Sequence, residues 1–199
     1  MDVDGFWELI DRSRAGTGTV WQRTSWLEER LRCLPAGEIV DFEAVLDRLR
    51  RRADTWDLLA AHDVITDGCG GGDLYFYFLH WLIGQGRQQY EQVVACADAL
   101  AENPHIRTLA GRHGQWTDEE YPDWEGLLSV AAYAYAAVTG TQISDYNDVR
   151  GLTGSLSDPD TRGTEWDLGD PQELARRLPR LRRLVSSPPG SAPQVEAGS

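Results

Sequence analysis

Residues 67–87 read DGCGGGDLYFYFLHWLIGQGR, a glycine-rich loop that leads into the densest apolar block of the chain. The apolar block, residues 74–83, is interrupted only by His80 and ends at Gly84-Gln85-Gly86. A segment that is apolar on every side has to be buried, so the more amphipathic segments before and after it are suited to cover it. Periodicity alone does not separate a buried strand from a buried helix in such a run, but the helical patterns on both sides favour a helix.

Apolar residues at helical spacing mark the segments around this block. Residues 87–100 resume that spacing and so pair with the block as a helical hairpin. Residues 105–118 are polar and predicted to be irregular. The predicted fold is mainly α, a compact multi-helix bundle around a buried helical hairpin at about residues 74–100, with a loosely structured C-terminal extension. The other predicted helices cover about residues 2–10, 20–33, 35–52, 55–65 and 122–140, the last of them placed beside the apolar block.

The composition of the chain changes after about Thr141. Glycine, serine, aspartate and threonine dominate as far as Gly169, which indicates a polar linker. Asp170-Pro171-Gln172-Glu173 is a well-formed helix start, and the short arginine-rich helix after it could fold back onto the acidic body or meet a partner. We predict a helical domain over residues 1–143, a polar linker and short basic helix over 144–185, and a disordered tail over 186–199.

The formal net charge of −13 restricts the classes of partner. A chain this acidic is not expected to bind nucleic acid or an anionic membrane surface, whereas a basic protein, a cation or a neutral small molecule is compatible with it. No apolar run approaches the roughly 18 residues of a membrane span, and the acidic, amphipathic start of the chain does not resemble a signal peptide. We expect a cytoplasmic protein; its oligomeric state does not follow from the sequence.

Arginine supplies every basic residue, and the chain contains no lysine. A P-loop nucleotide site, a pyridoxal-phosphate enzyme and a protein kinase each require a lysine, so these three classes are excluded. Cys33, Cys69 and Cys96 are well separated and form no CxxC pair, which indicates reduced cysteines instead of a disulfide framework or zinc site. We expect no cofactor and no bound metal.

Three groups of residues form a pattern that extends over most of the chain. They are Phe6-Trp7-Glu8-Leu9-Ile10 near the start, then Thr55-Trp56-Asp57-Leu58, Asp67-Gly68-Cys69, Phe78, Trp81-Leu82-Ile83 and Gly86-Arg87 in the centre, and later Tyr133 or Tyr135 with Thr139-Gly140. This pattern resembles the bacterial domain-of-unknown-function family 4240 (DUF4240) over roughly residues 2–143. The resemblance implies a compact, mostly helical bacterial protein and brings no established activity. The chain departs from the family pattern at His80, where a basic or polar residue is usual, and at Gly71-Gly72, where acidic residues are usual.

The glycine-rich loop is surrounded by side chains that could carry chemistry. Cys69 could act as a nucleophile, activated by the start of the following helix and by His62 or His80 as base. The alternative is a buried structural cysteine, with the loop aspartates hydrogen bonded to backbone amides. Three acids around one thiol oppose its ionisation, so we assign no catalytic residue. The whole group comprises His62, Asp63, Asp67, Cys69, Asp73 and His80.

The aromatic residues of the apolar block could line a binding pocket, although such a run is more often plain core. Asp57 could stand at the rim of that pocket, or it could form a structural ion pair with Arg87. We expect a non-enzymatic binding or regulatory module whose acidic, aromatic-lined groove takes a protein or small-molecule ligand. The alternative is a small hydrolase or transferase built on the glycine-rich loop. The candidate binding residues are Trp56, Asp57, Asp67, Asp73, Tyr77, Trp81 and Arg87.

Overall fold

The computed structural model of the chain describes residues 1–15, 18–68, 72–143, 145–154 and 161–186, and confirms the predicted mainly α fold. Cys69 and the predicted tail lie outside these residues, apart from Ser186. The α-helices are α1 (Val3–Ala15), α2 (Val20–Leu31), α3 (Ala36–Ala53), α4 (Trp56–Thr66), α5 (Gly72–Gly84), α6 (Arg87–Ala95), α7 (Pro104–Leu109), α8 (Val130–Thr139), α9 (Tyr146–Thr153), α10 (Pro171–Arg177) and α11 (Pro179–Ser186). Short 3-10 helices are η1 (Ala97–Glu102), η2 (Asp118–Glu120) and η3 (Glu125–Leu128).

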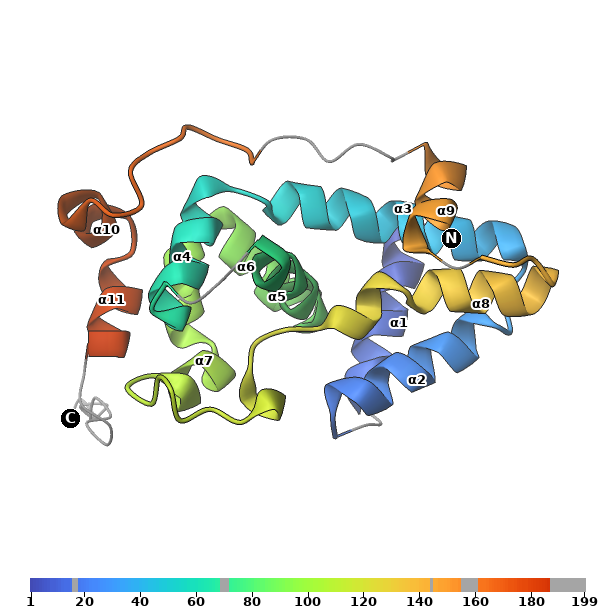
Figure 1. Ribbon diagram of the computed structural model, residues 1–199, viewed down its shortest axis with the longest axis horizontal. Coiled ribbons are helices and arrows are strands. Elements are labelled where there is room, and N and C mark those ends of the chain that lie inside the picture. The colour runs from blue at the N-terminus through green and yellow to red at the C-terminus, as the bar shows by residue number, and fades with distance from the viewer. Residues whose placement is uncertain (16–17, 69–71, 144, 155–160, 187–199) are drawn as a thin grey trace, which may run out of the picture.

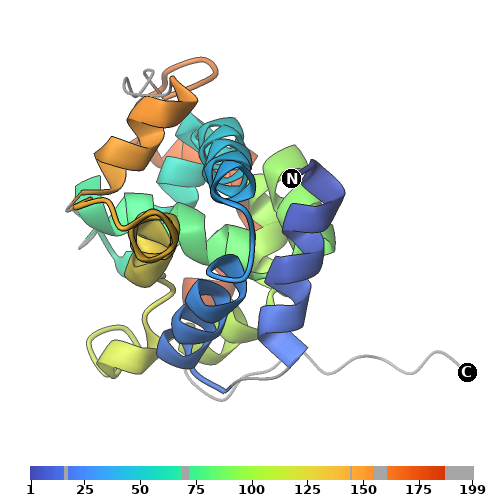
Figure 2. The ribbon, with the colours of Figure 1, turned by 90° about the vertical axis from the view of Figure 1, so that its right-hand side faces the viewer.

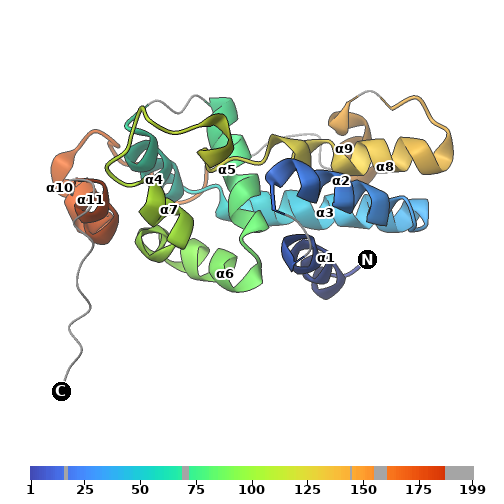
Figure 3. The same ribbon diagram turned by 90° about the horizontal axis from the view of Figure 1, so that it is seen from below.

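The long helix α3 runs along the long axis of the molecule, and α5 crosses it near its C-terminal end (Figures 1 and 3). Helices α1, α2, α8 and α9 gather at one end, where they surround α3 (Figure 2). Helices α4, α7, α10 and α11 form the other end, next to α6. None of the described helices combines the length and the hydropathy that crossing a bilayer requires.

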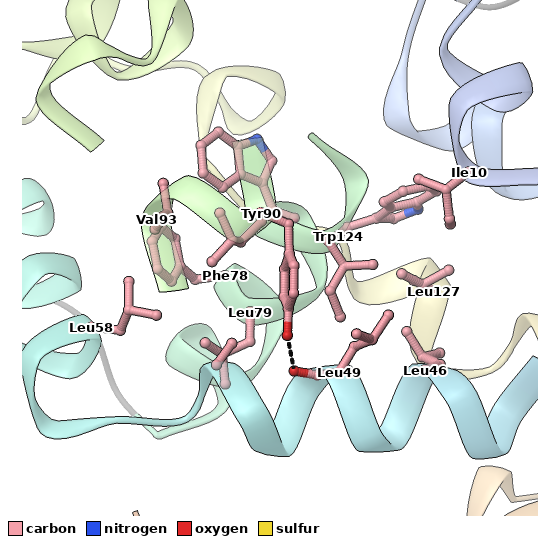
Figure 4. Close-up of a cluster of buried hydrophobic side chains, with 14 of the residues drawn as sticks. Ile10, Leu46, Leu49, Leu58, Phe78, Leu79, Tyr90, Val93, Trp124 and Leu127 are labelled. Atoms are coloured by element: carbon pink, nitrogen blue, oxygen red, sulfur yellow. Dashed lines mark hydrogen bonds between the residues drawn. The ribbon is translucent and has the colours of Figure 1, made fainter. Parts of the chain in front are cut away.

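The core is built around the α5–α6 hairpin, as the apolar block predicts (Figure 4). Phe78 and Leu82 of α5 are fully buried, and so is Tyr90 of α6. The Tyr90 hydroxyl donates a hydrogen bond of 2.7 Å to the Leu49 carbonyl of α3, which satisfies a polar group inside the core. Burying each large apolar side chain stabilises the fold by roughly 1.5–3 kcal/mol, so this hairpin accounts for much of the driving force for folding.

Polar side chains define several of the helix boundaries. Thr19 caps α2 in a capping box with Gln22, and Asp170 caps α10 as the sequence predicts. At the start of α4 the cap is Thr55, whose hydroxyl accepts from the Leu58 amide. These helix starts are therefore determined by side chains at the helix boundary itself.

The helix predicted over residues 122–140 is interrupted. The Trp124 amide donates a 3.1 Å hydrogen bond to the Tyr77 carbonyl of α5, so its peptide group is used for tertiary contact instead of helix propagation. Only this part, η3, lies beside α5, whereas α8 packs against α2 and α3. The predicted position of the whole helix beside the apolar block is therefore wrong.

Two further helices occur where the sequence predicts irregular structure. Helix α7 begins at Pro104, where the Asn103 side chain caps it, and extends to Leu109 into the region expected to be irregular. Helix α9 lies in the predicted linker and is held by tertiary packing, with Val149 and Arg150 buried. The predicted basic helix is two helices, α10 and α11, since Pro179 interrupts the pattern after Leu178.

Candidate functional site

The two histidines predicted as possible bases lie in the core. His62 packs against Phe78 with ring centroids 5.1 Å apart, and His80 packs against Phe76 at 4.7 Å. Burial lowers the pKa of His62 to about 4, and burial together with the charges of Arg50 and Arg150 lowers the pKa of His80 to about 3. Both rings are therefore neutral at pH 7 and serve as packing residues. Their proposed partner Cys69 lies outside the described residues.

The predicted ion pair between Asp57 and Arg87 is wrong. Arg87 pairs with Asp4 of α1 at 2.6 Å, and Asp57 pairs with Arg177 of α10 at 2.8 Å. Asp57 also accepts a 3.0 Å hydrogen bond from the Trp166 indole. Both partners of Asp57 come from the C-terminal region, more than a hundred residues away in sequence, so helical spacing cannot reveal them.

The structure spreads the predicted binding residues over separate places instead of one groove. Trp56 and Asp57 line a cavity of about 250 Å³ next to Arg177. Asp67 lines a different cavity of about 350 Å³ and lies 3.8 Å from His113. Asp73 is exposed in the first turn of α5, Tyr77 is half-buried, and Arg87 and Trp81 border two further pockets.

A pocket of about 500 Å³ lies between α2, the C-terminal end of α5 and residues 118–124. We call it the Trp21–Trp81 pocket. Four aromatic residues line it together with two acids and one arginine, the composition expected of a site that takes an apolar group carrying a charge. These residues are Trp21, Arg23, Trp81, Asp118, Glu119, Tyr121 and Trp124.

Trp81 and Trp124 form the inner wall of this pocket. Trp81 is only 5% exposed and stacks on Phe78 of the core at 5.5 Å, so its position is fixed by α5. The Trp124 indole donates to the Thr24 hydroxyl at 2.7 Å. A Cβ at Gly84 would stand 2.6 Å from the Trp124 ring, so only glycine allows the indole to lie this close to α5.

Arg23 belongs to the wall as well. Its guanidinium lies 4.1 Å over the Trp124 ring and donates to the Gly84 carbonyl at 2.9 Å and to the Ser13 hydroxyl at 3.2 Å. Burial, aided by the charge of Arg14, lowers the pKa of Arg23 to about 10, so the group remains charged at pH 7. Its positive charge directs any cationic group toward the opposite, acidic side of the pocket.

The rim of the pocket is aromatic and acidic. The Trp21 side chain is 76% exposed, an unusual position for so large an apolar group. Asp118 and Glu119 are exposed in η2. The next residue, Glu120, is held by Arg112 at 2.6 Å, and its carbonyl contacts His105 Nε2 at 2.9 Å, so the acidic segment is anchored to α7.

A shallower hollow of about 630 Å³ continues from the pocket past α1 and the start of α6. The two share Gln85 and His105, so together they form one extended groove. Arg87 and Arg14 lie along the second part. Of the predicted binding residues, Trp81 therefore lines the pocket and Arg87 lines the adjoining hollow.

Trp21 is not among the candidate binding residues expected from the sequence. Trp26, Leu27 and Leu31 are the predicted inward residues of α2, whereas Trp21 lies beside the polar residues Ser25 and Glu28 at helical spacing. A tryptophan on the polar face of an amphipathic helix is a signal for an interaction site. That signal was available from the sequence alone.

A second group of charged side chains, also missed, is buried between α3 and α9. Asp47 accepts from Arg50 at 3.0 Å and from Arg150 at 3.1 Å, and all three are 2–4% exposed. Glu43, one turn earlier on α3, is buried beside them, and burial together with the Asp47 charge raises its pKa to about 8. The helical spacing of Glu43, Asp47 and Arg50 directly beside the apolar stripe of α3 is the signal in the sequence.

In the described part of the chain, no three or more His, Cys, Asp or Glu side chains are arranged to hold a metal ion. Asp47 instead forms ion pairs with Arg50 and Arg150, which is the usual condition for burying charged side chains.

Comparison with known proteins supports the resemblance noted in the sequence. The model of the family described as "Protein of unknown function (DUF4240)" matches residues 1–137. No curated protein and no solved structure matches the chain. The matched region contains every residue of the Trp21–Trp81 pocket and ends within α8.

Proposed function

Since the chain belongs to the DUF4240 family, whose description names no activity, we propose from its surface chemistry that it is a binding module. The Trp21–Trp81 pocket receives a cationic side chain of a partner protein, with an arginine as the best fit. The exposed Trp21 side chain at the mouth of an aromatic pocket with an acidic rim is the observation that carries this proposal.

The orientation of the bound side chain follows from the charges around the pocket. Aromatic faces attract a guanidinium or ammonium group through their negative quadrupole, an effect worth about 0.5–2 kcal/mol per contact. Asp118 and Glu119 add charge attraction at the rim, while Arg23 repels a second cation at the inner wall. The alkyl stem of the ligand therefore lies against the indoles and its charged end faces η2. The net charge of −13 steers a basic partner toward the molecule.

A pair of capped peptides that differ in one side chain tests the proposal. One carries a central arginine and the other carries citrulline, which has the same shape without the charge. We expect the arginine peptide to bind about tenfold more tightly by calorimetry, equivalent to about 1.4 kcal/mol. The double variant Asp118→Asn, Glu119→Gln should remove most of that difference.

Two exposed residues outside the pocket serve as matched controls. Tyr133→Ala removes an aromatic side chain that is 55% exposed on α8, and Glu8→Gln removes a carboxylate that is 69% exposed on α1. Neither should change the affinity. Equal binding of the two peptides, or equal loss of affinity in the controls and in Trp21→Ala, would contradict the proposed site.

A further inference from the structure

The C-terminal helices α10 and α11 cover one end of the molecule, where they lie against α4 and η1 (Figure 1). We call residues 170–186 the strap. Leu178 and Leu181 of the strap are fully buried and belong to the main hydrophobic core. The basic segment thus folds back onto the acidic body, one of the two alternatives that the sequence left open.

Asp98 of η1 is the centre of this contact. Its carboxylate is only 4% exposed and accepts hydrogen bonds from the backbone amides of Arg180 at 3.0 Å and Leu181 at 2.9 Å. The Arg180 side chain adds a third bond, from Nε, at 2.9 Å. A residue more than eighty positions away therefore caps the N-terminus of α11, the place where a helix favours a carboxylate.

Further acids on the body pair with arginines of the strap. Arg177 pairs with Asp57 of α4 at 2.8 Å, and Arg180 also pairs with Glu102 of η1. The Asp57 and Glu102 side chains are 45% and 70% exposed, so solvent weakens these ion pairs. These ion pairs therefore contribute more to the specificity for a basic segment than to the affinity of its binding.

The strap leaves space along both of its edges. A cavity of about 250 Å³ lies between Arg177, Trp56 and residues 93–97. A second cavity of about 350 Å³ lies where Val185 and Ser186 face Ile106 and Trp116. The strap therefore does not fill the surface on which it lies along either edge.

From these observations we propose that the surface of α4 and η1 around Asp57 and Asp98 is a docking site for a basic amphipathic helix of a partner protein. The strap occupies this site in cis and competes with the partner. The recognition pattern is an arginine followed by leucine in the first helical turn, with Asp98 as the cap. The receiving residues lie inside the family region of residues 1–137, whereas the strap lies outside it. This inference is independent of the Trp21–Trp81 pocket.

The test uses the full chain and a labelled synthetic peptide of residues 170–186. The substitutions Arg180→Ala and Leu181→Ala weaken the contact of the strap without changing any residue of the receiving surface. We call the chain that carries both the strap-weakened chain. We expect it to bind the peptide about tenfold or more tightly than the natural chain, in which the tethered strap competes at high effective concentration. Adding Asp98→Asn to the strap-weakened chain should reverse that gain, whereas adding Glu8→Gln should not. Equal affinity of the natural and strap-weakened chains, or a gain that survives Asp98→Asn, would overturn the proposal.

Hydrogen exchange of the natural chain provides a second test that needs no variant. The α11 amides should exchange about a hundredfold or more faster than those of α5, because a displaceable helix opens without global unfolding. Added salt should accelerate exchange in α11 and not in α5, since charge pairs help to hold the strap. Exchange in α11 as slow as in α5 would show that the strap is a permanent part of the fold.

Discussion

In the first half of α5, Tyr75 and Phe78 lie in the core against His62, whereas at its C-terminal end Trp81 forms a wall of the Trp21–Trp81 pocket. Both places use aromatic side chains of the same helix. They differ in what the rest of the chain places beside them: apolar helices in one case, exposed Trp21 and the acids of η2 in the other. Aromatic content alone therefore does not distinguish a candidate binding site from core. The charges and the solvent exposure around the aromatic side chains make that distinction.

The strongest expected effect concerns the first half of α5. Phe78 is 0% exposed and contacts both His62 and Trp81, so Phe78→Ala leaves a cavity that the surrounding helices cannot fill. We expect a loss of about 3–5 kcal/mol in the free energy of unfolding, measured in urea. A loss below about 1 kcal/mol would show that this half of the helix is not core.

A smaller effect is expected for Glu43 in the buried charged group between α3 and α9. The folded protein keeps the Glu43 proton up to a pKa of about 8, whereas the unfolded chain releases it near 4.5. The contribution of Glu43 to stability is therefore complete at low pH and is lost as the pH rises from about 4.5 to about 8. Glu43→Gln should remove that loss, worth on the order of 1–3 kcal/mol between pH 5 and pH 8.

The measurement is urea unfolding of the natural chain and of Glu43→Gln across that pH range. His80 acts in the opposite direction, because its lowered pKa removes stability as the pH falls below 6.5. Both proteins contain His80, so their difference isolates Glu43. Glu8→Gln, exposed on α1, should show the pH dependence of the natural chain. Identical pH profiles for Glu43→Gln and the natural chain would contradict a neutral, buried Glu43.

The smallest effect on stability is expected for a substitution at the rim of the Trp21–Trp81 pocket. Since the Trp21 side chain is 76% exposed, Trp21→Ala should change the free energy of unfolding by less than about 0.5 kcal/mol. The same substitution should weaken binding of the arginine peptide severalfold, measured by calorimetry. A large loss of stability would mean that Trp21 supports the fold, and the contrast between the two ends of α5 would fail.

The sequence predicts the α5–α6 hairpin well because its signal is local: a continuous apolar block, a glycine break and renewed helical spacing. It does not predict the pocket, since Trp21, Trp81 and Glu119 come together only through the packing of three separate segments. Even Gly84 carries no local signal for its role, which is to admit the Trp124 ring. The partner of Asp57 likewise depends on where the chain returns after more than a hundred residues.

The most direct test of the central claim is a fluorine NMR titration of the protein labelled with fluorotryptophan. The chain contains eight tryptophans, so each resonance can be assigned by single substitution to phenylalanine. On addition of the arginine peptide, we expect shifts for Trp21 and Trp81, with Trp7 of the core and Trp166 near the strap unchanged. Shifts at Trp166 without shifts at Trp21 and Trp81, or no shift at any tryptophan, would contradict it.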